Sequence, residues 1–241
     1  MSGAARAGAG AAAAPESGPA TWRARLGGAV GGSLFHLLYA VEAHGRANVP
    51  TRGPVILAAN HTGYLDGAFL HSMSPRPAHF LVLAQTFDTV VGPLLHLTGQ
   101  IPIDQKVGDR RALGQAIEVL RRGGVVGIFP EGGRGPGDLS QAGRGVAWLA
   151  LQAKAHVVPV ACLGTRAAGE HADAWPRLRS RLVADFGEPI HLTAPDGIPG
   201  RQRLALASEQ IRATLAAHVA DASARHGIPL PMDVPEGLVN T

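Results

Sequence analysis

With 241 residues and a mass of 24.8 kDa, the chain is long enough for one sizeable hydrophobic core, and nothing in its spacing demands a second domain. Its single cysteine, Cys162, follows an apolar run and fits a buried thiol, which excludes an internal disulfide framework and a cysteine-rich metal site. The formal charge of +4 favours anionic partners, and because recognition-helix, zinc-finger and RNA-platform signatures are absent, we expect anionic lipid or an acidic carrier protein rather than nucleic acid.

The N-terminal part of the chain contains two different segments. Residues 1–20 are rich in Ala, Gly, Pro and Ser without helix or strand periodicity, which predicts a disordered tail. Residues 21–43 then form a hydrophobic helical segment with Trp22 and arginines at its start. Four glycines and His36 interrupt its apolar run, which is shorter than the roughly 20 residues of a membrane span. A helix in the membrane interface and a plain core helix both fit this pattern.

Short apolar runs and helical patterns alternate through residues 44–226. The predicted strands are residues 55–59, 79–84, 100–103, 125–129, 157–162 and 182–186. The predicted helices are residues 66–73, 86–97, 109–122, 143–155 and 200–226. Because the links are too long for hairpins, we expect one α/β domain whose largely parallel or mixed sheet has helices on both faces. Pro159 suggests an edge strand or a bulge, and residues 227–241 are a Pro-rich tail.

A histidine and a carboxylate lie close together in residues 60–67, which have the sequence NHTGYLDG between a predicted strand and a predicted helix. Open α/β sheets usually carry their active sites on such loops. A carboxylate at Asp66 that bonds one ring nitrogen of His61 would fix the tautomer and leave the other nitrogen as a general base. Alternatively, Asp66 only caps the following helix, and His61 is a polar residue at a strand end.

The second informative stretch, FPEGGRGPGD, occupies residues 129–138 after another predicted strand. Its glycines would let backbone N–H groups approach an anion, and Arg134 can donate two hydrogen bonds to phosphate oxygens. Glu131 would hold the Arg134 guanidinium or bond a substrate hydroxyl. A plain surface loop, in which Glu131 is a local cap, is the alternative.

Two further strand ends accompany these loops. Residues 100–105, QIPIDQ, precede a basic cluster that either faces the same anion or forms a solvated helix surface: Lys106, Arg110 and Arg111. Residues 156–165, HVVPVACLGT, predict a core strand whose following loop closes the pocket. A basic patch follows it that either suits a phosphorylated carrier or lipid head groups or only adds solubilising charge: Arg166, Arg177, Arg179 and Arg181.

In this order, the four pieces resemble the glycerolipid acyltransferase family, the 1-acylglycerol-3-phosphate acyltransferases of the PlsC type. That family has an NHxxxxD block, a strand ending in a basic residue, an FPEGTRS-like block and a VVPV-like strand. The corresponding segments here are NHTGYLDG, GQIPIDQ, FPEGGRG and VVPVA. The first and third blocks are specific at these spacings, whereas the second and fourth alone are weak.

The resemblance implies transfer of a fatty acyl group from acyl-CoA or acyl carrier protein to the hydroxyl of a lysophospholipid. His61 would be the general base, Asp66 would orient it, and the acceptor alkoxide would attack the thioester directly. No metal or cofactor is implied. The substrate-binding residues expected from the blocks and the basic cluster are Asn60, Glu131, Gly132, Gly133, Arg134, Lys106, Arg110 and Arg111.

Two departures from the family pattern leave the acceptor open. Gln105 stands where many relatives have Arg, and Gly133 and Gly135 replace the usual Thr and Ser. Relatives commonly begin with a membrane-embedded hydrophobic helix, so the resemblance favours a membrane-interface anchor at residues 22–43. It implies a peripheral or monotopic enzyme at the cytoplasmic face of the cell membrane.

Two other classes of protein stay open on the sequence. A metal-dependent hydrolase would use His61, Asp66 and His71 as ligands, although no further clustered ligand completes the shell. A non-catalytic lipid-binding module would keep the fold without turnover. Metal analysis and thioester consumption distinguish these classes from an acyltransferase.

Overall fold

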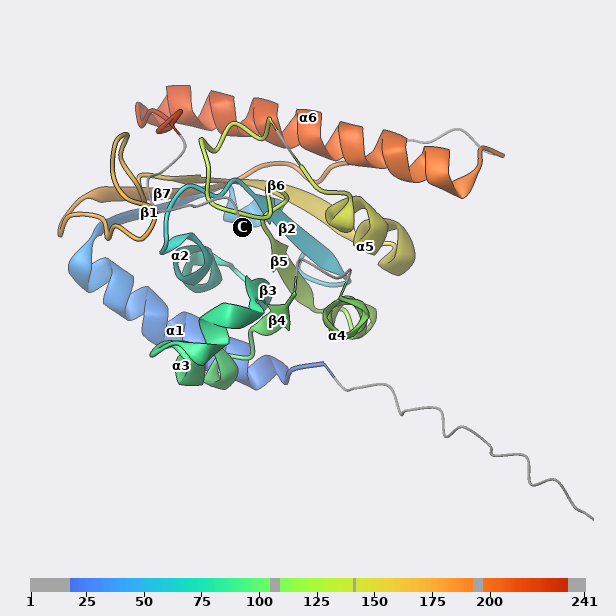
Figure 1. Cartoon of the computed structure of the whole chain (residues 1–241), viewed down its shortest axis with the longest axis horizontal. Coiled ribbons are helices and arrows are strands. Elements are labelled where there is room, and N and C mark those ends of the chain that lie inside the picture. The colour runs from blue at the N-terminus through green and yellow to red at the C-terminus, as the bar shows by residue number, and fades with distance from the viewer. Residues whose placement is uncertain (1–17, 105–108, 141, 193–196, 234–241) are drawn as a thin grey trace, which may run out of the picture.

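A seven-stranded mixed sheet forms the centre of the molecule (Figure 1). The computed structural model describes residues 18–104, 109–140, 142–192 and 197–233. Neighbouring strands are parallel except β6 and β7, and the order across the sheet is β1-β7-β6-β2-β5-β3-β4. The strands are β1 (Ala40–His44), β2 (Val55–Ala59), β3 (Ala78–Leu83), β4 (Ile101–Ile103), β5 (Val125–Ile128), β6 (His156–Leu163) and β7 (Arg181–Phe186).

Helices cover both faces of this sheet, which confirms the predicted α/β class. In Figure 1, α6 runs along the upper side of the sheet, and α1 and α2 lie on the lower side. The helices are α1 (Thr21–Leu38), α2 (Asp66–Met73), α3 (Gly92–Leu97), α4 (Arg110–Arg121), α5 (Gly145–Ala153) and α6 (Gly200–His226), with short 3₁₀ turns at Arg46–Asn48 and Ala84–Asp88.

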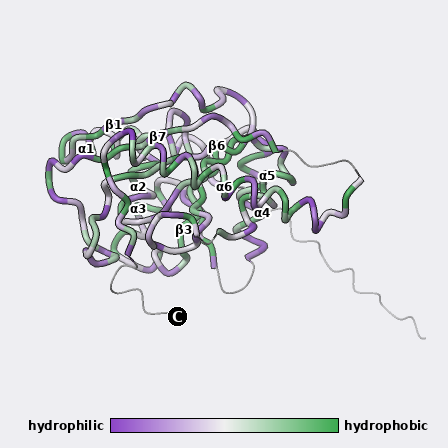
Figure 2. Tube along the Cα trace, turned by 90° about the horizontal axis from the view of Figure 1, so that it is seen from above, coloured by the Kyte–Doolittle hydropathy of each residue, from purple (hydrophilic) through white to green (hydrophobic). Residues whose placement is uncertain are grey.

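The alternating side chains of the strands supply two cores, one on each face. In β2, Ile56 and Ala58 join the core under α4, α5 and α6, whereas Val55, Leu57 and Ala59 join the core under α1 and α2. Burial on both faces explains why β2 is a continuous apolar run rather than an alternating one. In Figure 2, the trace along β6 and α5 is likewise predominantly hydrophobic.

Two of the predicted helical segments differ from the observed ones. The segment predicted over residues 21–43 is helical only to Leu38, and β1 follows it, paired in parallel with β7. The predicted helix over residues 86–97 is divided into a 3₁₀ turn and α3. The chain turns tightly before α3, and Gly92 lies so close to the carbonyl of Phe87 that a Cβ atom would clash there. This turn interrupts the helix that the sequence predicts.

The prediction of an edge strand at Pro159 is wrong, because β6 lies between β7 and β2. The alternative of a bulge agrees with the register, in which the three steps from Val157 to Val160 lie opposite four steps on the partner segment, residues 186–190. The Pro159 carbonyl accepts a hydrogen bond from Gly187 N at 2.8 Å, just beyond the end of β7. The β6–β7 ladder begins only at Val160. The nitrogen of a residue in a strand points to the same side as its carbonyl. The nitrogen of Pro159, which has no hydrogen to donate, therefore faces the chain beyond the end of β7, where no ladder hydrogen bond is lost.

Helix α1 has two unlike sides. Its glycines allow close packing on α2 and on the end of α3, where Gly31 faces Ser72 and Gly27 faces Thr98. The opposite side exposes large apolar side chains at Trp22, Leu26, Val30, Leu34 and Leu37. In the part of the chain that the structure describes, no helix combines the length and apolar character needed to cross a membrane.

Candidate active site

The parallel strands β2, β5 and β6 end at the same edge of the sheet, and the loops after them meet there. Strand β2 ends at Ala59 and α2 begins at Asp66, so residues 60–65 form the strand-to-helix loop that the sequence predicts. Residues 129–144 follow β5, and residues 164–180 follow β6. The candidate site is built from these three loops.

His61 and Asp66 are in direct contact in this loop. The Nδ1 atom of His61 lies 2.8 Å from Oδ2 of Asp66, and the carboxylate is fully buried while the imidazole is 20% exposed. A carboxylate can only accept, so Nδ1 carries the proton and donates. The other ring nitrogen, Nε2, is therefore left with the lone pair that a general base needs.

Asp66 organises the loop before the helix rather than capping the helix. Its Oδ2 atom also accepts from the backbone N–H groups of Thr62 at 2.7 Å and Gly63 at 2.9 Å, both of which precede α2. The N-cap residue of α2 is Leu65, which makes no side-chain capping bond. The alternative role of Asp66 as a helix cap is thus not what the structure displays.

The second oxygen of Asp66 is held by β6 and the loop after it. Thr165 donates a short hydrogen bond from its hydroxyl to Oδ1, and the buried Cys162 thiol lies 3.4 Å from the same atom. Burial raises the pKa of Cys162 well above its usual value, so this thiol stays protonated as the structural residue that the sequence predicts. The sequence pattern placed this loop at the pocket but did not single out Thr165.

Phe129 and Glu131 hold His61 from the side of β5. The rings of His61 and Phe129 are stacked with centroids 4.2 Å apart. Glu131 accepts the backbone N–H groups of His61 at 2.9 Å and of Leu139 at 3.1 Å. Burial raises the pKa of Glu131 to about 7, although these two donors favour its ionised form.

Arg134 lies beside the loop of His61, but Glu131 does not hold it. Its guanidinium Nη1 atom lies 3.0 Å from Oδ1 of Asp173, in the loop after β6. The same guanidinium lies over the ring of Tyr64, a residue of the NHTGYLDG loop, at 5.6 Å from the ring centroid. Of the roles open to Glu131, the pairing with Arg134 is therefore wrong. Its carboxylate bonds backbone donors of the loops instead, as the alternative of a local cap predicts.

The glycines of this loop are mostly used inside the protein. The N–H of Gly132 donates to the carbonyl of Phe129 at 3.1 Å, and that of Gly135 donates to the carbonyl of His61 at 2.9 Å. A Cβ atom at Gly137 would clash with the Thr62 side chain, which shows how closely the two loops approach. Gly133 faces open space. Two of the glycine N–H groups that the sequence predicts for an anion-binding loop therefore donate within the protein instead.

Asn60 has a structural role instead of the predicted substrate contact. It is fully buried, its amide Oδ1 accepts from Cys162 N at 2.7 Å, and its Nδ2 donates to Cys162 O at 3.0 Å. Both ends of the amide thus bond one residue of β6. Asn60 joins β2 to β6 immediately before His61, so it fixes where the loop of His61 begins.

The structure describes only part of the predicted basic cluster after β4. Lys106 and Gln105 fall outside the described residues. Arg110 and Arg111 are exposed at the start of α4, at the same edge of the sheet as His61. Strand β4, which precedes this cluster, is three strands from β2, so the carboxyl ends of the two strands are about 14 Å apart along the sheet.

Among the described residues, His61, Asp66 and His71 do not come together as metal ligands. His71 lies under α1, and its Nδ1 atom is 2.9 Å from the carbonyl oxygen of Ala78 rather than near Asp66. Within the described ranges, the group of side chains close enough to hold one ion is Glu42, His44 and His226, on β1 and the end of α6. That group contains neither member of the His61–Asp66 pair.

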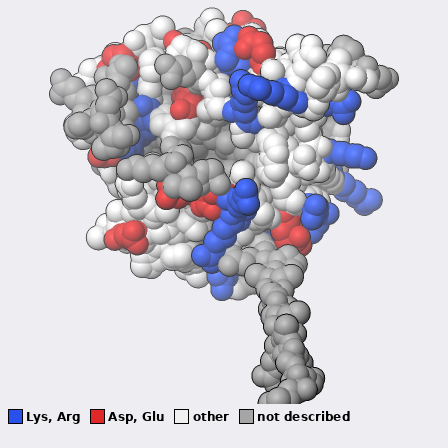
Figure 3. Space-filling view, turned by 45° about the vertical axis from the view of Figure 1, so that its right-hand side comes forward, with Lys and Arg blue, Asp and Glu red and all other residues white. Residues whose placement is uncertain are grey.

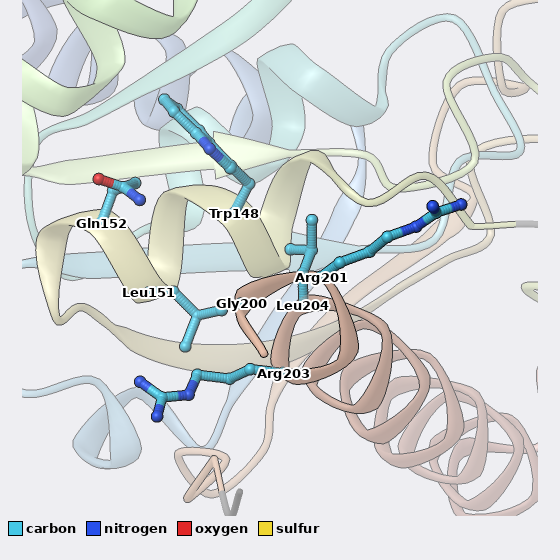
Figure 4. A pocket seen from close by; sticks show the side chains of 7 residues that line it. All are labelled: Trp148, Leu151, Gln152, Gly200, Arg201, Arg203 and Leu204. Carbon is cyan, nitrogen blue, oxygen red and sulfur yellow. The ribbon is translucent and has the colours of Figure 1, made fainter. Parts of the chain in front are cut away.

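A groove of about 470 Å³ lies elsewhere, between α5 and the first turns of α6 (Figure 4). Trp148 and Leu151 on one side and Leu204 on the other line it, with Arg201 and Arg203 pointing outward. It includes no residue that the sequence predicts for the site. None of its lining residues belongs to the three loops of the candidate site.

Comparison with known proteins begins with a family model. The model, described as Acyltransferase, matches residues 40–163, just over half of the chain. The chain is 27% identical over 180 residues to the 1-acyl-sn-glycerol-3-phosphate acyltransferase of Bacillus subtilis, covering 74% of this chain and 87% of that protein. It is also 30% identical over 181 residues to an uncharacterized protein of Mycobacterium leprae. The match covers 46% of that protein, so the chain spans about half of its length.

A solved structure shares the fold. The 1-acyl-sn-glycerophosphate acyltransferase PlsC from Thermotoga maritima superposes with a TM-score of 0.64 at 21% identity, covering 84% of this chain and 80% of that chain. The mixed sheet with helices on both faces is thus the fold of a known enzyme.

Proposed function

The chain belongs to the acyltransferase family, and we propose that it moves a fatty acyl group from acyl-CoA or acyl carrier protein to the hydroxyl of 1-acylglycerol-3-phosphate, giving phosphatidic acid. The observation that carries this proposal is the 2.8 Å contact of His61 Nδ1 with buried Asp66, which leaves Nε2 as a base at the edge of the sheet. The name of the Bacillus relative supports the choice of acceptor.

The proposed reaction is a direct transfer. The Nε2 atom of His61 takes the proton of the acceptor hydroxyl, and the oxygen forms a bond to the thioester carbonyl carbon. The carbon–sulfur bond breaks, and the thiolate leaves with the proton from His61. Asp66 stabilises the imidazolium that exists between these steps, as a buried carboxylate does for a base histidine. The buried thiol of Cys162 takes no part.

Arg134 is the proposed partner of the acceptor phosphate. Its guanidinium is 22% exposed and lies between the loops after β2, β5 and β6. Its present partner, Asp173, is 59% exposed, so a phosphate with two charges can displace that carboxylate at small cost. A planar guanidinium suits two oxygens of one phosphate.

The departures at Gln105, Gly133 and Gly135 favour a second candidate within the same chemistry, an acyltransferase with another acceptor. Both candidates use His61, and they differ only in the lysolipid consumed. Labelled acyl-CoA and labelled acyl carrier protein, each offered with a panel of lysolipids and followed by product mass, distinguish them. Phosphatidic acid as the main product supports the first candidate.

We expect His61→Ala to reduce acyl transfer by roughly 10²- to 10⁴-fold, because the acceptor hydroxyl then loses its proton acceptor. The matched control is His156→Ala, since His156 is exposed at the amino end of β6, on the edge of the sheet opposite to His61. The measurement is the turnover rate with a short-chain acyl-CoA and a lysophospholipid. Full activity of His61→Ala would refute the proposed mechanism.

A further inference from the structure

The segment after α6 returns to the candidate site. Gly227 ends α6 in a left-handed conformation (φ 64°), and the chain then runs to the loops at the carboxyl edge of the sheet. The Asp233 carboxylate Oδ2 accepts from Arg166 Nη1 at 3.1 Å and from Gly169 N at 3.1 Å. The Asp233 carbonyl accepts from Arg166 Nη2 at 3.0 Å. Residues 227–233 therefore form a strap across the loop after β6.

Arg166 connects this strap to two other loops. Its side chain is fully buried, in contrast to the exposed basic patch that the sequence predicts. Its Nε atom donates to the carbonyl of Thr62 at 2.8 Å, and its Nη2 atom donates to the carbonyl of Gly135 at 3.3 Å. One planar guanidinium thus bonds the loops after β2, β5 and β6 together with the strap.

The carbonyls that Arg166 holds belong to residues that also hold the catalytic pair. The N–H of Thr62 donates to Asp66 Oδ2, and the N–H of Gly135 donates to the carbonyl of His61. Arg166 itself touches neither side chain of the pair. From this network we propose that Arg166 is a positioning residue of the acyl transfer, and that Asp233 of the strap keeps its guanidinium in place.

The buried guanidinium of Arg166 needs an anionic partner, and Asp233 supplies it. A buried guanidinium without a paired anion is costly, and the carbonyls of Thr62, Gly135 and Glu170 offer only partial charges. Among the ion pairs of the described residues, Asp233 is the carboxylate partner of Arg166. Loss of that charge lets the guanidinium turn toward water, and the loop of His61 loses its fixed support.

The first variant changes Asp233, the partly exposed carboxylate of this hydrogen-bond network. Asp233→Asn preserves the shape but removes the charge, and we expect kcat to fall about tenfold while KM for the thioester stays unchanged, because small errors of position cost rate rather than binding. Glu209→Gln is the control, since it removes an equally simple Arg–carboxylate pair on the exposed face of α6. It should leave kcat unchanged. A wild-type kcat for Asp233→Asn would overturn the inference.

A second variant tests Arg166 directly. Arg166→Ala leaves a space that a guanidinium ion fits, so millimolar guanidinium should restore part of the lost kcat, whereas ethylammonium, a point charge, should not. Unchanged activity of Arg166→Ala would overturn the inference, as would equal rescue by both ions. If Arg166→Ala does not fold by circular dichroism, Asp233→Asn alone decides.

This inference rests on the proposed function, and the two can fail separately. If His61→Ala is fully active, the proposed function fails. If His61→Ala is inactive while Asp233→Asn keeps the wild-type kcat, only the role of Arg166 and the strap fails.

Discussion

Glu131 supports the loop of His61 through hydrogen bonds, and its carboxyl group has a raised pKa. Its carboxylate accepts the backbone of His61 and of Leu139, yet burial raises its pKa to about 7. In the unfolded chain the same group titrates near 4.5. The folded state therefore binds this proton more tightly, which favours folding at low pH and is lost as the pH rises from about 4.5 through about 7.

We predict that Glu131→Gln becomes progressively more stable relative to the parent protein between pH 5 and pH 8. The amide does not titrate, whereas the buried carboxyl must ionise in that range, at a cost on the order of 3 kcal/mol at most. Urea unfolding of both proteins across this range gives the difference in unfolding free energy. The test is how this difference changes with pH. A backbone hydrogen bond lost in the variant would lower its unfolding free energy by the same amount at every pH and leave that change unaffected. Parallel curves for the two proteins would contradict the prediction.

At the scale of the elements, the packing of α1 depends on glycines at chosen positions. A Cβ atom at Gly27 would lie about 2.5 Å from Thr98 Cγ2 and 2.9 Å from His71 Nε2. At Gly32, the nearest atom would be the carbonyl oxygen of Ser72 at 3.6 Å, an ordinary contact. The two glycines thus differ in what surrounds them although they share one helix.

We predict opposite effects for Gly27→Ala and Gly32→Ala. The first forces α1 away from α2 and α3 and should lower the free energy of unfolding by about 1–3 kcal/mol, as overpacking does. The second keeps the packing and should raise it by about 0.5–1 kcal/mol, because alanine favours the helix. Chemical unfolding of both variants measures this. A stabilised Gly27→Ala protein would show that α1 is not closely packed there.

At the scale of the whole molecule, apolar surface is concentrated on α1 and near α3. Besides the exposed side of α1, the side chains of Val90, Leu94 and Leu97 are exposed around α3, and α1 contacts the end of α3 through Gly27 and Thr98. Figure 3 shows another face, where Lys and Arg side chains lie among broad uncharged areas. We propose that the α1 and α3 surface lies in the membrane interface of the cytoplasmic leaflet, since exposed apolar side chains gather there.

We predict that the double variant Leu26→Ser with Leu34→Ser binds vesicles at least about tenfold more weakly than the parent protein, since each change removes one exposed leucine from the apolar face. Cosedimentation with vesicles of phosphatidylglycerol and phosphatidylcholine measures this. Leu206→Ser is the control, because Leu206 is exposed on α6, across the sheet from α1. Equal loss of binding in the control would argue against a specific membrane surface on α1.

The sequence by itself determined the features that depend on local pattern. Strand β2, helix α2 and helix α6 have the predicted bounds, because buried runs and helix periods are properties of neighbouring residues. The spacing of His61 and Asp66 within one short loop also required no distant contact, and the family follows from blocks in a fixed order. The catalytic roles of this pair stay predictions.

Only the tertiary structure decided which distant residues meet. Strand β1 was missed because its partner β7 lies about 140 positions along the chain, and Arg134 pairs with Asp173 rather than with nearby Glu131. Asn60 bonds β6, and the buried Arg166 pairs with Asp233, in a segment that the composition described only as Pro-rich. Hydrogen bonds and burial between segments depend on how the strands are ordered in the sheet, and a single sequence carries no direct record of that order.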